Sequence, residues 1–499
     1  MGQADGSVLT TAYDAAGNPV TTTDALGKQT VYGYDRLNRV ITTTDSLGHQ
    51  TLSGYDLAGN RTALIDALGR VKTYGYDALD RTSDITYSDG TTPNVRYTYT
   101  PTGQRARMTD GTGATTYGYD ALDRVITTTT GAGNGVGYGY DAVGNTTTIT
   151  YPNSSVVTRT YDTLDRLSSV RDWLGHTARF GYDADNPITQ TLPTSVTTSV
   201  GLGYDAADRL IGITDTTPIT TWTYTYSRDK SGAITAATDP LDGKTHSYSY
   251  DKLAGLIADN QGAGAITSTV GWANDAAREV TQRLDPSGSY TSTLTYDNAH
   301  ELTGTTTLSG TTPLKNVAYA YNKDGDRTAQ SDSVSGAKST FGYDQADRLI
   351  SATTGITQAS YSYDGDGLRQ SKVIGTQVLT ETWDTTTTAE TWDTAEGLPT
   401  LLQDGPRATS LAPTACPSNR STATATCSTT CTTNWARRAS CSTARATPSP
   451  PTPTTPTATQ QAAPETRRRR SGMPERTRTP KRASNTCKRA TTTQPRNNS

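Results

Sequence analysis

The residues that could carry out chemistry are few in this sequence. Its 499 residues include four histidines, and none of its five cysteines comes before residue 405. Thiol catalysis and cysteine-ligated zinc are therefore excluded from the part of the chain before that residue. His49 and His176 follow Leu-Gly at a position where other segments carry a lysine or an arginine, Lys28 and Arg70. Since any of these polar residues is accepted there, and His246 and His300 are isolated, we expect no catalytic or metal-ligating histidine.

Two aspartate-rich segments have oxygen ligands of the kind that calcium binds. They are "DGDR", which begins at Asp324, and "DGDGLR", which begins at Asp364. An EF-hand loop needs further oxygen ligands and a bidentate glutamate at its end, and neither segment supplies them. Both segments closely follow a tyrosine, where comparable segments have ordinary turns, so we interpret them as turns and expect no metal cofactor.

The last part of the chain has a different composition. From residue 406 onward it contains 16 Lys and Arg against Glu465 and Glu475, a net charge of +14, which leaves −17 for residues 1–405. Such a basic segment is typical of a nucleic-acid arm. Three of its five cysteines, Cys427, Cys431 and Cys441, suggest a metal knuckle, but the segment has no histidine to complete the ligand set.

A repeat of 21 residues organises the chain before this segment. Its sign is a Tyr-Asp pair, whose tyrosine we call the marker tyrosine; the 21-residue spacing connects Tyr13, Tyr34, Tyr55 and Tyr76, and later Tyr119, Tyr140, Tyr161 and Tyr182. The pattern continues with slightly wider spacing to Tyr363, which makes about 17 units. A periodic aromatic residue implies a periodic burial site, so we expect order here despite the low hydrophobic content.

Each unit is predicted to contain two strands and two turns. In "VKTYGYD" alternate residues are large, and an aromatic residue stands two positions before the marker, so both rings share one strand face. The glycine between them, such as Gly33 or Gly75, leaves the other face bare for the close approach of another layer. The marker turn follows, as in Asp35–Arg39, and then a Thr-rich strand and a return turn "D-x-L-G", as in Asp24–Gly27. Glycine supplies the positive φ that this second turn needs.

The array predicts an all-β fold of antiparallel hairpins. Two strands in each unit give roughly thirty strands, and an open sheet rarely exceeds about ten without curling. We therefore expect the sheet to wind into a curled or spiral wall around a hollow. A parallel β-helix is the alternative, but it favours continuous Val/Ile stacks, which are absent. The repeat-signature residues, to which we assign structural roles, are Tyr34, Asp35, Arg39, Tyr55, Asp56, Tyr76, Asp77, Arg81, Tyr119, Asp120, Arg124, Tyr161, Asp162, Arg166, Tyr204, Asp205, Arg209, Tyr343, Asp344 and Arg348.

These units resemble the RHS or YD-repeat family. "GYDALDRV", "TYDTLDRL" and "GYDQADRL" match the family consensus, and the resemblance covers roughly residues 10–400. It implies a hollow β-shell, which in bacterial polymorphic toxins encloses a C-terminal toxin domain and in teneurins supports cell-surface recognition. The partners implied for the intact protein are a toxin domain and its immunity protein. A carbohydrate-binding surface adhesin built from the same units is the alternative, with glycans as partners, and a cytoplasmic enzyme comes third.

The basic segment is predicted to be translated out of frame. When the codons possible for Thr430 through Ser442 are read from each third base, they permit "L-H-D-Q-L-G-S-T-R-L-L-L", which looks like the motif that closes an RHS core. In the same frame, residues 446–459 permit "D-A-V-A-T-Y-T-Y-D-P-Y-G-N" and residues 485–494 permit "Y-L-Q-A-R-Y-Y-D-P". The three matches place a base insertion or deletion between about Leu402 and Arg420. The cysteines and arginines then imply no metal or nucleic-acid partner.

The predicted organisation is a partial repeat over residues 1–12, the array over 13–400 and a disordered low-complexity tail over 401–499. No apolar run is long enough to span a membrane, and the first residues lack the basic and apolar regions of a signal peptide. We expect a non-enzymatic fragment of a shell whose intact form is secreted or displayed at the cell surface.

Overall fold

The computed structural model describes residues 8–184, 186–192, 198–263, 266–285, 288–384, 400–404, 407–410 and 419–421. The chain divides into two compact units, Met1–Ala444 and Arg445–Ser499, and all of the described residues lie in the first. Within these residues every regular element is a strand, and no helix that could cross a membrane is found.

The strands are short and follow one another at regular intervals. The first half of the array contains β1 (Thr10–Tyr13), β2 (Pro19–Thr23), β3 (Gln29–Tyr34), β4 (Val40–Thr44), β5 (Gln50–Tyr55), β6 (Arg61–Ile65), β7 (Val71–Tyr76), β8 (Thr82–Tyr87), β9 (Val95–Tyr99), β10 (Arg105–Asp110), β11 (Gly113–Tyr119), β12 (Val125–Thr129), β13 (Gly135–Tyr140), β14 (Thr146–Thr150), β15 (Val156–Tyr161), β16 (Leu167–Arg171), β17 (Thr177–Asp183), β18 (Asn186–Leu192) and β19 (Thr198–Tyr204).

The second half contains β20 (Leu210–Thr216), β21 (Thr221–Arg228), β22 (Ile234–Asp239), β23 (Lys244–Tyr250), β24 (Leu256–Ala263), β25 (Ile266–Asn274), β26 (Val280–Leu284), β27 (Tyr290–Tyr296), β28 (Leu302–Ser309), β29 (Thr312–Tyr321), β30 (Arg327–Asp332), β31 (Lys338–Tyr343), β32 (Leu349–Thr354), β33 (Thr357–Tyr363), β34 (Arg369–Ile374), β35 (Gln377–Asp384), β36 (Thr400–Asp404), β37 (Arg407–Ser410) and β38 (Asn419–Ser421).

Each strand pairs antiparallel with the next one along the chain, as β3 does with β4 and β34 with β35. The all-β hairpin prediction is therefore confirmed, and the parallel ladders of a β-helix are not found among the described strands. The last three strands, β36–β38, lie inside the segment predicted to be a disordered tail. They continue the antiparallel pairing from β35. The rest of that prediction falls on residues 405–406, 411–418 and 422–499, which lie outside the described residues.

A bulge precedes each marker tyrosine, and it explains the glycine at this position. The pairing of β3 with β4 shifts by one residue between Gly33 and Tyr34. A Cβ on Gly33 would lie 2.3 Å from Oγ1 of Thr42 on the neighbouring strand. The expectation that another layer packs on this bare face is therefore wrong for Gly33: the space is taken by a threonine hydroxyl of the same sheet.

Both turns are closed by an aspartate at their first position. In the marker turn Asp35–Arg39, Oδ1 of Asp35 accepts hydrogen bonds from the backbone N–H groups of Leu37 and Arg39 at 2.8 and 3.0 Å. The fourth residue, Asn38, has φ of 60°, which Asn and Asp tolerate better than most residues. In the return turn Asp24–Lys28 the corresponding residue is Gly27, with φ of 81°.

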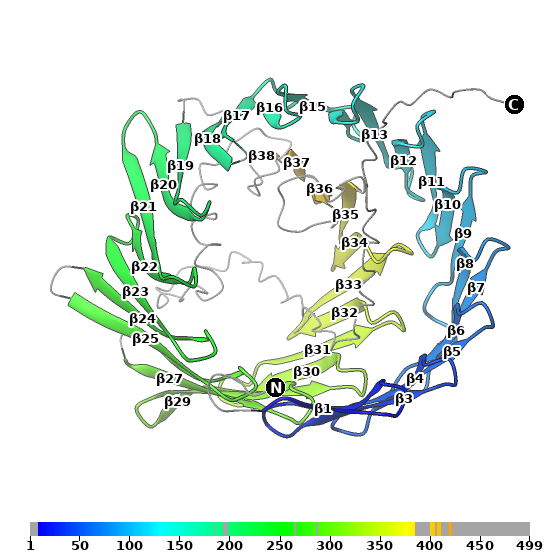
Figure 1. The fold of residues 1–499 in the computed structure, drawn as a ribbon, viewed down its shortest axis with the longest axis horizontal. Helices are drawn as coiled ribbons and strands as arrows, with labels where there is room; N and C mark the ends of the chain where they lie inside the picture. Colours follow the sequence, from blue (N-terminus) through cyan, green and yellow to red (C-terminus); the bar gives the residue numbers. More distant parts are fainter. Residues whose placement is uncertain are drawn as a thin grey trace, which may run out of the picture. The chain divides into compact units, whose positions relative to one another are not determined.

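The sheet winds until its later strands lie beside its first ones. Figure 1 shows the strands following a curve from β1 (blue) to β29 (green), after which β30–β34 (yellow-green) run alongside the first strands. Contacts between residues more than 250 positions apart agree: Gln345 donates its backbone N–H to Oγ1 of Thr92 at 2.8 Å. The predicted winding is confirmed. The right-handed twist that each strand pair adds accounts for the curvature, because it accumulates over many strands.

The apolar core consists of separate patches on the sheet. One is formed on β13–β17, another on β19–β22, and a small one on β9 and β10 contains Val95, Tyr97 and Met108. Val95 and Met108 are 2% and 1% exposed, although they lie near one rim of the sheet. Another part of the chain must therefore cover these side chains.

Candidate functional site

The marker tyrosines join each repeat to the one before it. The hydroxyl of Tyr161 donates a hydrogen bond of 2.8 Å to the carbonyl oxygen of Thr146, at the start of β14. The same bond, 14 to 19 residues back along the chain, is made by Tyr34, Tyr55, Tyr76, Tyr99, Tyr119, Tyr140, Tyr182, Tyr204, Tyr250, Tyr296, Tyr321 and Tyr363. A neutral hydrogen bond of this kind stabilises a protein by about 1 kcal/mol, so the repeats are stabilised by a periodic series of such bonds.

The arginine that ends a marker turn joins its repeat to the following one. Nε of Arg39 donates to Oδ2 of Asp35 at 2.6 Å, and Nη1 donates to the backbone oxygen of Asp56 in the next marker turn at 2.8 Å. The guanidinium carbon also lies 4.7 Å from the ring centroid of Tyr55. The same side-chain ion pair is made by Arg81, Arg124, Arg166, Arg209 and Arg348 with Asp77, Asp120, Asp162, Asp205 and Asp344.

The structure thus brings the predicted signature residues together in groups of neighbouring repeats. Asp56, which has no arginine in its own turn, binds the side-chain amide of Asn60 instead. Tyr343 stands after the bulge of β31, as the other marker tyrosines do on their strands. None of these contacts places a reactive group beside an open cavity, and the arrangement suits a structural role.

Each of the four histidines has a ring nitrogen close to a carboxylate. Nδ1 of His49 lies 3.1 Å from Asp45, and Nδ1 of His176 lies 3.0 Å from Asp172, in the position where Arg70 contacts Asp66. In the other two histidines both ring nitrogens contact acids: His246 lies between Asp242 and Asp259, and His300 between Asp24 and Glu279. Among the described residues, no group of three His, Cys, Asp or Glu side chains is arranged to hold a metal ion.

A row of polar contacts, which we call the seam, joins the two windings. It links return turns of the first winding, and Arg105 at the start of β10, to marker turns of the second. Asp324 accepts a hydrogen bond from the backbone N–H of Ala67 at 2.9 Å and an ion pair from Nη2 of Arg70 at 2.6 Å. Further along the seam, Arg105 pairs with Asp366 at 2.6 Å. At its other end, Nζ of Lys28 donates to the backbone oxygen of Asp297 at 2.6 Å.

One marker turn of the seam packs against apolar side chains. The backbone N–H of Gly365 donates to Oδ2 of Asp110 at 2.6 Å. A Cβ on Gly365 would lie 2.5 Å from Cγ1 of Val95 and 2.8 Å from Sδ of Met108, so only glycine fits. This turn therefore helps to cover the core patch of β9 and β10.

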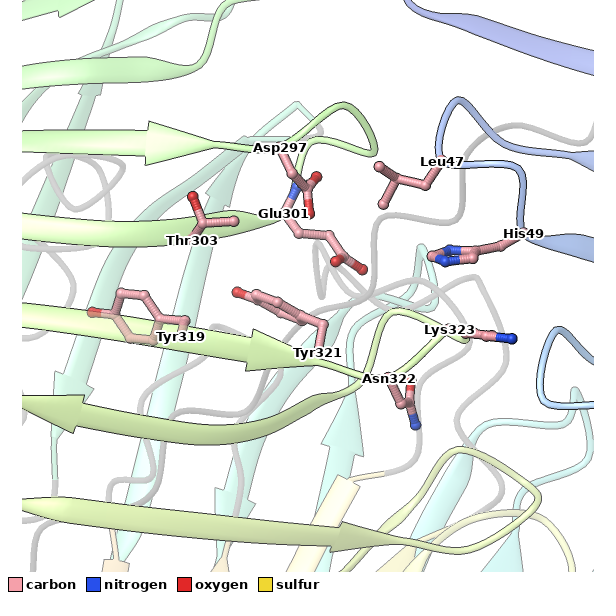
Figure 2. A pocket seen from close by; sticks show the side chains of 9 residues that line it. All are labelled: Leu47, His49, Asp297, Glu301, Thr303, Tyr319, Tyr321, Asn322 and Lys323. Atoms are coloured by element: carbon pink, nitrogen blue, oxygen red, sulfur yellow. The ribbon is translucent and has the colours of Figure 1, made fainter.

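An open pocket of about 240 Å³ lies within the seam. Figure 2 shows Leu47 and His49 entering it from the first winding, while Glu301, Tyr321 and Lys323 come from the second. The Glu301 carboxylate extends toward the side lined by His49 (Figure 2). The pocket is lined by two acids, Asp297 and Glu301, and by side chains from both windings, so it is part of the interface between them.

Several carboxyl groups at the seam are harder to ionise than usual. Burial raises the pKa of Glu301 to about 7, with a further contribution from the neighbouring charge of Asp297. Burial also raises the pKa of Asp364 to about 6, reinforced by Asp366 and, across the seam, by Asp110. The pKa of Asp324 is likewise raised by its burial and by Asp66. Closing the windings against each other therefore places acids in a partly desolvated environment.

Sequence reasoning missed the seam because it treated Asp324 and Asp364 as ordinary turn residues. A signal was present at the third position of the marker turns. This position holds exposed Leu37 and Leu79 in the first winding, with 63% and 71% of their surface accessible. In two of the four seam turns it holds Asp324 and Asp366, whose carboxylates bind arginines, and in the other two it holds Ala299 and Ala346. A leucine is suited to neither contact.

Comparisons with known proteins agree with this geometry. Residues 4–50, 55–92 and 140–177 match the family model described as RHS Repeat. No curated protein matches the sequence. Among solved structures, a Tc holotoxin pore of Photorhabdus luminescens is 14% identical, with a TM-score of 0.59 over 78% of this chain and 24% of that chain. A TcdB2-TccC3 crystal structure is 14% identical, with a TM-score of 0.60 over 79% of this chain and 25% of that one.

A third structure, TcdB2-TccC3 without its hypervariable C-terminal region, is 15% identical, with a TM-score of 0.59 over 79% of this chain and 24% of the other. The chain therefore spans about a quarter of the length of these structures, and the likeness establishes the fold. Residues 4–50, 55–92 and 140–177 of this fold match the RHS Repeat model.

Proposed function

We propose that this chain is a non-enzymatic length of protein wall, and that in the intact protein the wall encloses and delivers a C-terminal toxin domain. The observation that carries the proposal is the seam. The windings are joined by Arg70–Asp324, by Arg105–Asp366 and by the Gly365 contact. They therefore form a continuous surface rather than a loose coil. A continuous wall can separate an enclosed polypeptide from its surroundings.

The printed descriptions of the related structures support this role. They name a holotoxin pore and a TcdB2-TccC3 protein with a hypervariable C-terminal region. By analogy, the intact form of this protein would be secreted or displayed at the cell surface, with a variable toxic segment and its immunity protein as partners. The carbohydrate-binding alternative would need available tyrosines. The marker hydroxyls instead bind backbone carbonyls, as Tyr161 does, which favours a wall.

The proposal includes the reading-frame change between about Leu402 and Arg420. Its test is the nucleotide sequence. Read one frame over, it should encode "L-H-D-Q-L-G-S-T-R" opposite Thr430–Ser442, further Tyr-Asp units and then a separate domain. A stop codon soon after residue 420, or other residues at these codons, would contradict the frame change.

The enclosing role is tested on the protein made from the frame-corrected gene. We expect the segment that follows the closing core to resist protease in this protein and to be digested when it is made alone. Substitution of Arg70 by Glu, which opposes Asp324 with a like charge, should expose that segment. Digestion at the same rate with and without the wall would contradict the enclosing role while leaving the fold assignment intact.

A further inference from the structure

The seam follows a strict order in which one marker turn sits between two successive return turns. Turn Asp297–Glu301 contacts Lys28 in one return turn and Ser46 in the next. Turn Asn322–Asp326 follows it, between the return turns that contain His49 and Arg70. Each of these two gaps between return turns therefore seats one turn.

The order continues along the rim. Turn Asp344–Arg348 contacts both Arg70 and Thr92, which belong to successive return turns. Turn Asp364–Leu368 comes next and contacts Asp110. The rim then continues to return turns Thr130–Asn134, Tyr151–Ser155 and Asp172–His176, which have the same closing hydrogen bonds. No seam contact is found for these three among the described residues.

An open pocket of about 520 Å³ lies in the gap between the last two of these return turns. It is lined by residues 153–156 on one side and 171–175 on the other. One wall is rigid, because the Trp173 ring packs edge-on against Tyr151 with 5.3 Å between the ring centroids. In position, this pocket is the equivalent of the gap that seats turn Asn322–Asp326.

The chemistry of the pocket also corresponds to that of the filled gap. Asp324 is held by the backbone N–H of Ala67, the second residue of its return turn, and by a cationic side chain, Arg70. In return turn Asp172–His176 the second residue is Trp173. The position of Arg70 is held by His176, whose ring contacts Asp172, and the cation that lines the pocket is Arg171, which precedes the turn and is exposed at the end of β16. Among the described residues Arg171 has no ion-pair partner.

We propose that this pocket is the docking site for a marker turn with an acidic third residue, contributed by a further repeat. The carboxylate of that residue would accept a hydrogen bond from the backbone N–H of Trp173 and form an ion pair with Arg171. Two gaps lie between this pocket and turn Asp364–Leu368, so the occupant is the third marker turn after that one. That turn belongs to the frame-corrected protein, so its identity rests on the proposed frame change. Turns with leucine at the third position, such as Asp35–Arg39, do not fit this site.

The test uses the full chain and two peptides of equal length, each closed by a disulfide between added terminal cysteines. One reproduces residues 319–330 with the Asp324 turn, and the other residues 32–43 with the Leu37 turn. We expect fluorescence anisotropy to show saturable binding of the first peptide only. Because a charge-assisted pair is involved, Arg171→Glu should weaken binding by about tenfold or more.

The matched control is Arg179→Glu, which changes an exposed arginine on the adjacent strand β17 outside the pocket and should leave binding unchanged. A peptide with Asp324→Lys tests the same contact without altering the protein, and it should bind about as weakly as the leucine peptide. The proposal is overturned by absence of saturable binding, by equal binding of the two peptides, or by equal effects of the two arginine substitutions. The docking site does not depend on an enclosed toxin, so the docking proposal and the enclosing role can each fail without the other.

Discussion

Arg70 and Asp324 are 254 residues apart in the sequence, yet Nη2 of Arg70 lies 2.6 Å from Oδ2 of Asp324. Arg70 also binds Asp66 in its own return turn and lies 3.7 Å from Asp347 in the next marker turn. A single side chain therefore connects one turn of the first winding to two turns of the second. The acids it contacts would repel one another without it.

Replacement of Arg70 by Ala should destabilise the protein by about 2 kcal/mol, because Asp324 is left nearly buried without its cation. The matched control is Arg96→Ala. Arg96 pairs with Asp84 at 2.8 Å but remains 73% exposed, so its loss should destabilise the protein far less than the loss of Arg70. Urea unfolding of the two variants measures the difference, and equal losses would show that the seam contributes no more than a surface pair.

Tyr161→Phe should cost about 1 kcal/mol, because it removes the hydroxyl that donates to Thr146 while leaving the ring in place. Tyr13 is a marker tyrosine with 63% of its surface exposed. Tyr13→Phe should therefore change the free energy of unfolding by only a few tenths of a kcal/mol. The prediction fails if the two substitutions shift the unfolding midpoint equally.

The seam should be more stable at pH 5 than at pH 8. The pKa of Glu301 is raised from 4.5 to about 7 and that of Asp364 from 3.8 to about 6. A carboxyl group whose pKa is raised on folding stabilises the folded state fully below its unfolded pKa. That stabilisation is lost as the pH rises through the folded value. The urea concentration at the midpoint of unfolding should therefore decrease as the pH is raised from 5 to 8.

Glu301→Gln should reduce this pH dependence, since the amide cannot ionise. Thr303→Ala changes a residue of the same pocket that does not titrate, and it should leave the slope as it is. A midpoint that increases over this pH range, or a slope that Glu301→Gln leaves unaltered, would contradict the assignment.

Gly365→Ala should destabilise the protein by about 1–3 kcal/mol, because its Cβ would lie within 3 Å of Val95 and Met108. The control is Gly203→Ala, where the nearest atoms to the new Cβ lie 3.9 Å away. Neither glycine has a positive φ, so the comparison isolates crowding from backbone strain. Thermal unfolding of the two variants checks it. A larger loss of stability for Gly203→Ala than for Gly365→Ala would contradict the tight contact at Gly365.

The hairpin array could be predicted because its contacts connect residues that are near in sequence. Asp35 binds backbone groups two and four residues ahead, and Tyr34 reaches the backbone of Pro19. The role of Gly33 could not be predicted correctly, because the atom that excludes a side chain there belongs to Thr42 on the partner strand. Its position depends on the bulge, which the repeat spacing alone does not reveal.

Amino-acid order alone is enough to predict the repeat, the strands, the two turns and the RHS resemblance, because each depends on side chains and backbone groups within one or two units. Which marker turn meets which return turn is known only from the folded structure. That pairing depends on curvature added in small amounts by more than twenty successive strands, and a slightly different twist per strand would bring a different turn to Arg70. The contacts of Asp324 and Gly365 are therefore properties of the wound sheet.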